Sequence, residues 1–107
     1  MQLLYYIEAT GRSPFAAWFD ELPQEAAAKV AVALKRMEQG NLSQVKSVGE
    51  GVQEYRINFG PGYRVYFGYD RKTIIILLAG GTKHRQQRDI DAAKSRWADY
   101  RNRKAMQ

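Results

Sequence analysis

Two arginines lie where the sequence predicts the polar face of a β-hairpin. Arg56 and Arg64 flank the segment 60–62, Gly-Pro-Gly, which separates two runs of alternating apolar and polar residues. A guanidinium keeps its charge and can hold two phosphate oxygens at once, so this pair of arginines suits the binding of a polyanion. Strand alternation places three further polar side chains on the same face, namely Glu54, Asn58 and Tyr66.

The position of the turn decides which residues of this hairpin face each other. If the two strands close symmetrically about Pro61, Asn58 lies opposite Arg64 and Arg56 lies opposite Tyr66. The other face of both strands is apolar, and we expect it to face the core with the side chains of Tyr55, Ile57, Phe59, Tyr63, Val65 and Phe67.

A second basic cluster, Lys83, His84 and Arg85, directly follows a pair of glycines at 80–81. We expect the glycines to end an apolar strand over 73–78 and to let the backbone turn sharply. Because that strand has no polar face, we expect it to be central and covered on both sides. His84 is the only histidine, and histidine is the residue type best suited to proton transfer near neutral pH, although a lone surface histidine often has no function.

Positive charge is concentrated towards the C-terminal end of the chain. The 107 residues carry a formal net charge of +6 with a pI near 9.7. The range 83–104 holds eight Lys or Arg and three Asp or Glu, a balance of +5, which leaves +1 for the remainder. A localised basic region predicts a polyanionic partner, most often nucleic acid. The alternative is a solvated basic helix that binds no ligand.

Length and composition indicate one compact domain, residues 1–107. The absence of cysteine excludes a disulfide framework and a thiolate zinc site. One histidine and scattered carboxylates lack the spacing of metal ligands, and no phosphate-cradling motif is present, so we expect no cofactor. No apolar run is long enough to span a bilayer and no signal segment begins the chain, so we expect a cytoplasmic protein without membrane association.

Periodicity predicts the elements that precede the hairpin. A first strand is expected over 2–8, and Ser13-Pro14 has the form of a helix start, with serine as N-cap. A second helix starts at Pro23 and ends at Gly40-Asn41, where glycine permits a left-handed cap. The inward stripes of the two helices are Phe15, Trp18, Phe19 and Leu22, then Ala27, Val30, Leu34 and Met37.

A short extended piece over 44–48 leads into the hairpin, and a last helix is expected from about Gln87 to Arg103. The stripe that this helix turns inward consists of Ile90, Ala93, Trp97 and Tyr100. The order of elements predicts an α+β domain: a mostly antiparallel sheet with two N-terminal helices packed on one face and a C-terminal helix.

Three segments of the chain, SPFAAWFDEL, EYRINFGPGYRVYF and GGTKHRQQRDI, resemble the phage-related addiction-module killer proteins, the HigB branch of the RelE/ParE toxin superfamily. The resemblance runs from Tyr5 to about Lys94 and implies a RelE-like fold. It also implies the toxin of a type II toxin–antitoxin module, which a cognate antitoxin keeps inactive. That antitoxin is often a small HigA-like helix-turn-helix protein.

The resemblance leaves more than one activity open. RelE and HigB relatives are endoribonucleases that cleave mRNA on the ribosome and inhibit translation. In this reaction the ribose 2′-OH attacks the adjacent phosphodiester and leaves a 2′,3′-cyclic phosphate. ParE relatives share the fold but inhibit DNA gyrase, so the fold alone does not decide the activity. A further alternative is a module that binds RNA or DNA without catalysis.

RNA cleavage needs a base for the 2′-OH proton, cations for the dianionic phosphorane and an acid for the leaving 5′-oxygen. By resemblance, Arg64 takes the place of a phosphate-stabilising arginine, while Arg56 and Asn58 take the places of two strand lysines. Arg56 is expected to stabilise charge because arginine stays protonated. The structural alternative for Arg64 is a cross-strand ion pair with Glu54 or Asp70.

Lys83 and His84 match the basic pair that follows the glycines in the family, and Ile90 stands in the place of a late tyrosine. Glu54 or His84 is the candidate base, and His84 or Lys83 is the candidate acid. The candidate catalytic residues are thus Arg64, Arg56, Lys83, His84 and Glu54. The candidate RNA-binding residues are Asn58, Tyr66, Arg85 and Arg88.

Overall fold

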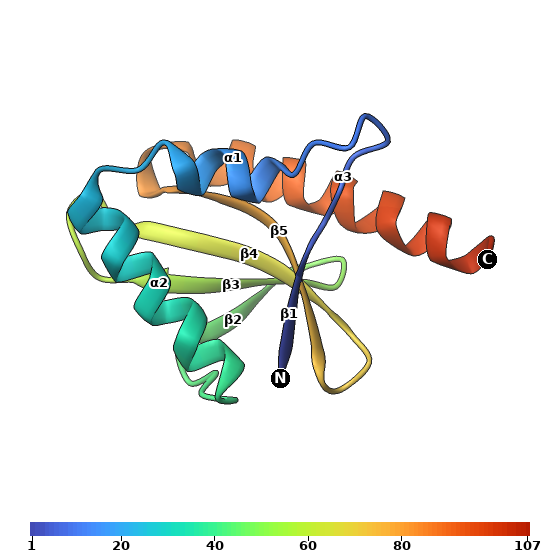
Figure 1. Ribbon diagram of the computed structural model, residues 1–107, viewed down its shortest axis with the longest axis horizontal. Coiled ribbons are helices and arrows are strands. Elements are labelled where there is room, and N and C mark those ends of the chain that lie inside the picture. Colours follow the sequence, from blue (N-terminus) through green and yellow to red (C-terminus); the bar gives the residue numbers. More distant parts are fainter.

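The computed structural model describes the whole chain, residues 1–107, as one five-stranded sheet with helices on both faces (Figure 1). The strand order is β1-β5-β4-β3-β2. Only β1 and β5 pair in parallel, and the other neighbours are antiparallel. The strands are β1 (Gln2–Tyr5), β2 (Val45–Gly49), β3 (Val52–Ile57), β4 (Tyr63–Asp70) and β5 (Ile74–Thr82). The predicted α+β class and mostly antiparallel sheet are confirmed.

The helices α1 (Pro14–Asp20) and α2 (Gln24–Glu38) pack against one face of the sheet, as predicted. Ser13 caps α1 by accepting a hydrogen bond from the Ala16 amide at 3.1 Å. The core on this side joins both helices to β3, β4 and β5, and its buried members are Phe15, Val30, Ala33, Met37, Tyr55, Val65, Phe67, Ile75 and Leu77. The predicted apolar face of the hairpin is therefore the face that meets these helices.

The C-terminal helix α3 (Gln86–Ala105) covers the opposite face, after a short 3-10 turn over Lys83–Arg85. Its buried residues Ile90, Ala93 and Trp97 pack on Val52 and Tyr66 and on the middle of β5. β5 is an interior strand, between β1 and β4, and it is covered on both faces, as expected. The last turns of α3 are exposed and run out beyond the sheet (Figure 1). No helix combines the length and apolar character needed to cross a bilayer.

The predicted sharp turn at residues 80–81 is wrong, because β5 continues through both glycines to Thr82. A Cβ at Gly80 would overlap the ring of Trp18, and a Cβ at Gly81 would overlap the carboxylate of Asp89. The two glycines therefore let α1 and α3 approach the strand closely from its two sides.

A β-bulge at Leu78 sets which way these glycines face. The ladder pairs Tyr66 with Ala79 and Phe67 with Leu77, which leaves Leu78 without a partner. Arg96 of α3 donates from Nη1 to the Leu78 carbonyl at 3.0 Å. The extra residue turns Leu78 and Ala79 to the same side, towards α3.

The hairpin register differs from the predicted one by two residues. The ladder places Arg56 opposite Arg64 and Glu54 opposite Tyr66, so the turn is centred on Gly60 and not on Pro61. Residues 58–62 form the loop, in which Gly60 and Gly62 have positive φ angles of 54° and 81°. A shift of two residues keeps every side chain on its predicted face.

Candidate functional site

Arg64 and Glu54 form a buried ion pair at the centre of the polar sheet face. Their side chains are 4% and 0% exposed, and Arg64 Nε lies 3.6 Å from Glu54 Oε2. Arg64 Nη1 also donates to the Gly62 carbonyl at 2.9 Å. The guanidinium is therefore held from two sides, by a carboxylate behind it and by the backbone of the β3–β4 loop.

The carboxylate of Glu54 has two further neighbours at the start of α3 and on the edge strand. Gln86 donates from Nε2 to Glu54 Oε2 at 2.9 Å, and Lys46 Nζ lies 3.8 Å from Oε1. The buried hydroxyl of Tyr66 makes no hydrogen bond. Its burial, and then the negative charge of Glu54, raise the pKa of Tyr66 far above the usual tyrosine value. Glu54 and Tyr66 thus lie behind Arg64, beneath α3, and do not reach solvent.

A small basic hollow opens beside the β3–β4 loop, with a volume of about 210 Å³. Its charged lining residues are Arg56 of β3, Arg64 of β4 and Lys83 of the 3-10 turn, and Asn58 adds a polar amide. Lys83 is tied to the loop because its amide donates to the Gly62 carbonyl at 2.9 Å. No carboxylate lines the hollow, and the three charged side chains that line it are all cationic. We call this site the loop hollow.

Three further predicted residues are exposed and do not line the loop hollow. His84, Arg85 and Arg88 sit on the 3-10 turn and on the first turn of α3. None of the three forms an ion pair. The structure thus brings together four predicted residues in the loop hollow, Arg56, Asn58, Arg64 and Lys83, and it places Glu54 as the partner of Arg64.

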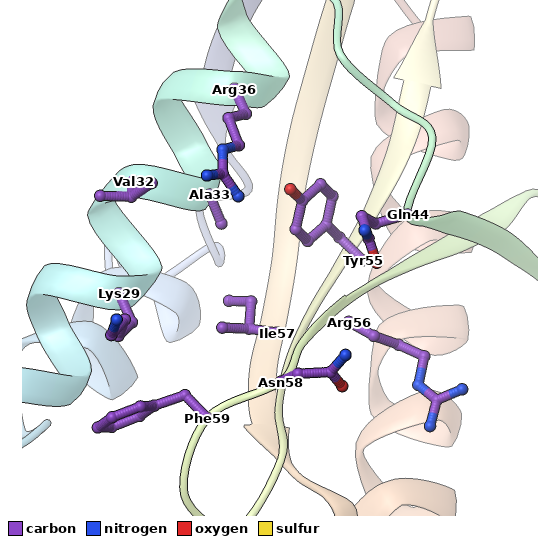
Figure 2. Close-up of a pocket in the computed structure, with 10 residues that line it drawn as sticks. All are labelled: Lys29, Val32, Ala33, Arg36, Gln44, Tyr55, Arg56, Ile57, Asn58 and Phe59. Atoms are coloured by element: carbon purple, nitrogen blue, oxygen red, sulfur yellow. The ribbon is translucent and has the colours of Figure 1, made fainter.

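A second hollow of about 290 Å³ lies between α2 and β3 (Figure 2). Figure 2 shows Tyr55, Ile57 and Phe59 pointing towards α2, whereas Arg56 and Asn58 point away from it. On the helix side the lining side chains are Lys29, Val32, Ala33 and Arg36. We call this site the α2 groove; it combines basic charge with exposed apolar surface, since Val32 is 49% exposed.

Sequence reasoning missed the contributions of Lys29, Arg36 and Gln86. Lys29 and Arg36 belong to the solvent-exposed face of α2. They line the groove only because that helix packs next to β3. Gln86 lies at the first position of α3, and its contact with Glu54 spans 32 residues of sequence. No local sequence pattern predicts the position of Lys29 and Arg36 in the groove or the contact between Gln86 and Glu54. No group of three or more His, Asp or Glu side chains is placed to hold a metal ion.

A small basic α+β domain with this five-stranded, mostly antiparallel sheet and a C-terminal helix is consistent with a RelE-like fold. The family model described as "Phage derived protein Gp49-like (DUF891)" matches residues 17–98. An uncharacterized protein of Haemophilus influenzae is 42% identical over 81 residues, which cover 75% of this chain and 82% of the relative. The chain belongs to the Gp49-like family, a family of RelE/HigB-like toxins.

Proposed function

We propose that this protein is the toxin of a type II toxin–antitoxin module, of the HigB branch, and that it cleaves mRNA on the ribosome. The observation that carries the proposal is the loop hollow, in which Arg56, Arg64 and Lys83 converge without a lining carboxylate. Three cations around a cavity of this size suit a phosphodiester whose charge increases during cleavage. The role places the protein in the cytoplasm, where translation occurs.

Arg64 is proposed to bind the scissile phosphate. Its Nη1 is engaged by the Gly62 carbonyl and its Nε faces Glu54, which fixes the plane of the guanidinium before substrate arrives. The remaining N–H donors of Arg64 can then hold phosphate oxygens without reorganisation. Arg56, directly opposite on β3, supplies a second positive charge. Together they stabilise the dianionic phosphorane.

The proton transfers are assigned to the exposed residues of the 3-10 turn. His84, exposed on this turn, takes the proton of the 2′-OH as the O2′–P bond forms. Lys83, which lines the loop hollow, gives a proton to the 5′-oxygen as the P–O5′ bond breaks. Glu54 is too deeply buried and too closely paired to reach a ribose, so its proposed role is to orient Arg64.

The proposed partner is a cognate antitoxin, a small HigA-like helix-turn-helix protein with an acidic or amphipathic segment. The α2 groove offers matching chemistry, since Lys29 and Arg36 lie beside exposed Val32. Lys29 Nζ lies 5.3 Å from the centre of the Phe59 ring, so the groove and the β3–β4 loop are in contact. Arg56 and Asn58 line both sites, so a segment bound in the groove would lie next to the loop hollow.

Induction of the protein without an antitoxin tests the proposal. Growth is expected to stop, and primer extension on translated messages is expected to show new 5′ ends within minutes. An Arg56→Ala variant serves as the control for cleavage by other nucleases. Growth arrest with intact messages and gyrase-linked DNA breaks would point to a ParE-like inhibitor, and binding without either effect would point to a non-catalytic nucleic-acid-binding module.

A further inference from the structure

A cleft with four arginines lies between α1 and the first half of α3, away from the loop hollow. Its volume is about 480 Å³, and none of its lining residues lines the loop hollow. Its lining comes from α1 and the residues that flank it, from the end of β5 and from the first half of α3 with the 3-10 turn. The arginines are Arg12, Arg85, Arg88 and Arg96. We call this site the arginine cleft.

Most of this positive charge is not neutralised by ion pairs. Arg85 and Arg88 form none, and Arg12 has only Glu8 of its own loop, at 3.7 Å. Arg96 is held by the bulged Leu78 carbonyl at 3.0 Å and forms no ion pair. Its Nη1 is engaged there, which leaves other N–H donors of the guanidinium for a ligand.

The rest of the cleft lining combines an aromatic side chain, a glycine and two carboxylates. Trp18 packs directly on Gly80, where a Cβ would overlap its ring. The ring thus covers the β5 backbone at Gly80, and both residues line the cleft. Glu21 is at the rim, and Asp89 lies over Gly81, where burial raises the pKa of its carboxyl.

We propose that the arginine cleft binds the phosphodiester backbone of single-stranded RNA, as a second contact beyond the cleaved phosphate; this rests on the proposed function. All four cations are arginine, whose fork fits two phosphate oxygens. Trp18 offers an aromatic ring for stacking, and Asp89 and Glu21 can accept hydrogen bonds from exocyclic amino groups of bases. An acidic peptide gains nothing from these two carboxylates.

The 3-10 turn gives the RNA a short path between the two sites. Lys83 lines the loop hollow and Arg85, two residues later, lines the arginine cleft, with exposed His84 between them. A strand that crosses this turn meets positive charge on both sides of it. The structure therefore predicts that affinity for RNA rises with length once the strand can occupy both sites.

The test uses fluorescence anisotropy with 2′-O-methyl oligoribonucleotides, which cannot be cleaved, of four and twelve nucleotides. The cleft variant is Arg12→Ala/Arg88→Ala, and the matched control is Lys72→Ala/Arg101→Ala, which removes the same charge from exposed residues without ion pairs. We expect the cleft variant to bind the twelve-mer roughly tenfold more weakly, with a salt slope lower by about two. Binding of the four-mer should change no more than in the control.

Equal twelve-mer affinity of the cleft variant and the control, with both variants folded by circular dichroism, would overturn the proposal. Displacement of the twelve-mer by polyglutamate at equal charge concentration would also overturn it and would identify an acidic-protein site. These results are separable from the proposed function. If only the cleft variant loses twelve-mer binding, the cleft proposal is supported even when the wild-type protein cleaves no mRNA. If the cleft variant binds like the control, the cleft proposal fails even when the wild-type protein cleaves mRNA.

Discussion

Arg56 and Arg64 lie directly opposite each other in the β3–β4 ladder, yet the first is exposed and the second is 3% exposed. Like charges in opposite positions of a sheet are destabilising unless a counter-charge is present. Glu54 supplies that counter-charge for Arg64 from within the protein. Arg56 has no carboxylate partner, so it is the cation that an incoming anion can neutralise.

The effects of substituting Glu54 and Arg64 on the free energy of unfolding are expected to be coupled. Substituting Glu54 is not expected to restore the RNA cleavage that is lost with Arg64. Arg64→Ala leaves a buried carboxylate with a weakened set of partners, so it should lower the free energy of unfolding by about 3 kcal/mol. The double variant Glu54→Gln/Arg64→Ala should regain about 1–2 kcal/mol of this loss and remain inactive in RNA cleavage. Urea unfolding of the wild type, the variants Glu54→Gln and Arg64→Ala, and the double variant measures the coupling. Additive losses of stability would show that the pair is not coupled.

The close approach of α3 to β5 should make Gly81 intolerant of any side chain. Gly81→Ala forces the new methyl group against the Asp89 carboxylate, and overpacking of this kind costs about 1–3 kcal/mol. Asp89→Ala in the same chain should restore most of the lost stability. Gly80→Ala, which meets the ring of Trp18 instead, provides the matched control: its melting temperature should fall and should not recover on Asp89→Ala.

The sequence predicted the sheet faces and the helix starts because these follow from local alternation and capping. Tyr55 and Val65 reached the core as expected, and Ser13 caps α1. The burial of Arg64 and Glu54 was not predictable in the same way. It depends on α3 docking over the polar face of the hairpin, and the stripe of that helix does not show which surface it covers.

The glycines at 80–81 illustrate a second limit of structure prediction from sequence. A Gly-Gly pair is equally compatible with a turn and with close helix packing, and only the contacts with Trp18 and Asp89 decide between the two. The register of the hairpin depends on which residue lies at the centre of the loop over 58–62. Local sequence favoured Pro61, whereas the left-handed conformation of Gly60 and Gly62 allowed the observed turn.

Asp70 is expected to stabilise the protein at neutral pH and not in acid. It accepts hydrogen bonds from Tyr100 and Lys104, and these contacts hold the pKa of Asp70 below its usual value. The Tyr100 pKa is raised to about 12, by burial and then by Asp70. A carboxyl group with a lowered folded-state pKa contributes stability above its unfolded pKa and loses it as the pH falls through the folded pKa.

Asp70→Asn should therefore lower stability by about 1 kcal/mol at pH 6, since the contact is partly exposed. The difference from wild type should shrink as the pH falls below about 4. Thermal unfolding of both proteins between pH 2 and 7 measures this. A difference that stays constant across the range would contradict the assigned role.

Antitoxin binding should depend on the α2 groove and cleavage should not. Arg36→Glu reverses a charge that lines the groove and should weaken an acidic antitoxin segment by roughly tenfold or more. Lys35→Glu, the next residue towards the N-terminus, lies outside the groove and makes the same charge change. Co-purification with the product of the adjacent reading frame measures the effect. An equal loss of antitoxin co-purification with both variants would show that antitoxin binding depends on net charge and not on the groove.

Cleavage of a defined message in a reconstituted translation reaction tests the central claim most directly. The wild-type protein is expected to cut only while ribosomes translate, and to leave 2′,3′-cyclic phosphate ends. Arg56→Ala, at an exposed position without ion pairs, should fold normally and cut roughly 10²–10³-fold more slowly, the usual cost of one lost transition-state contact. An intact message in the presence of wild-type protein, together with inhibition of gyrase supercoiling in a parallel reaction, would contradict this account.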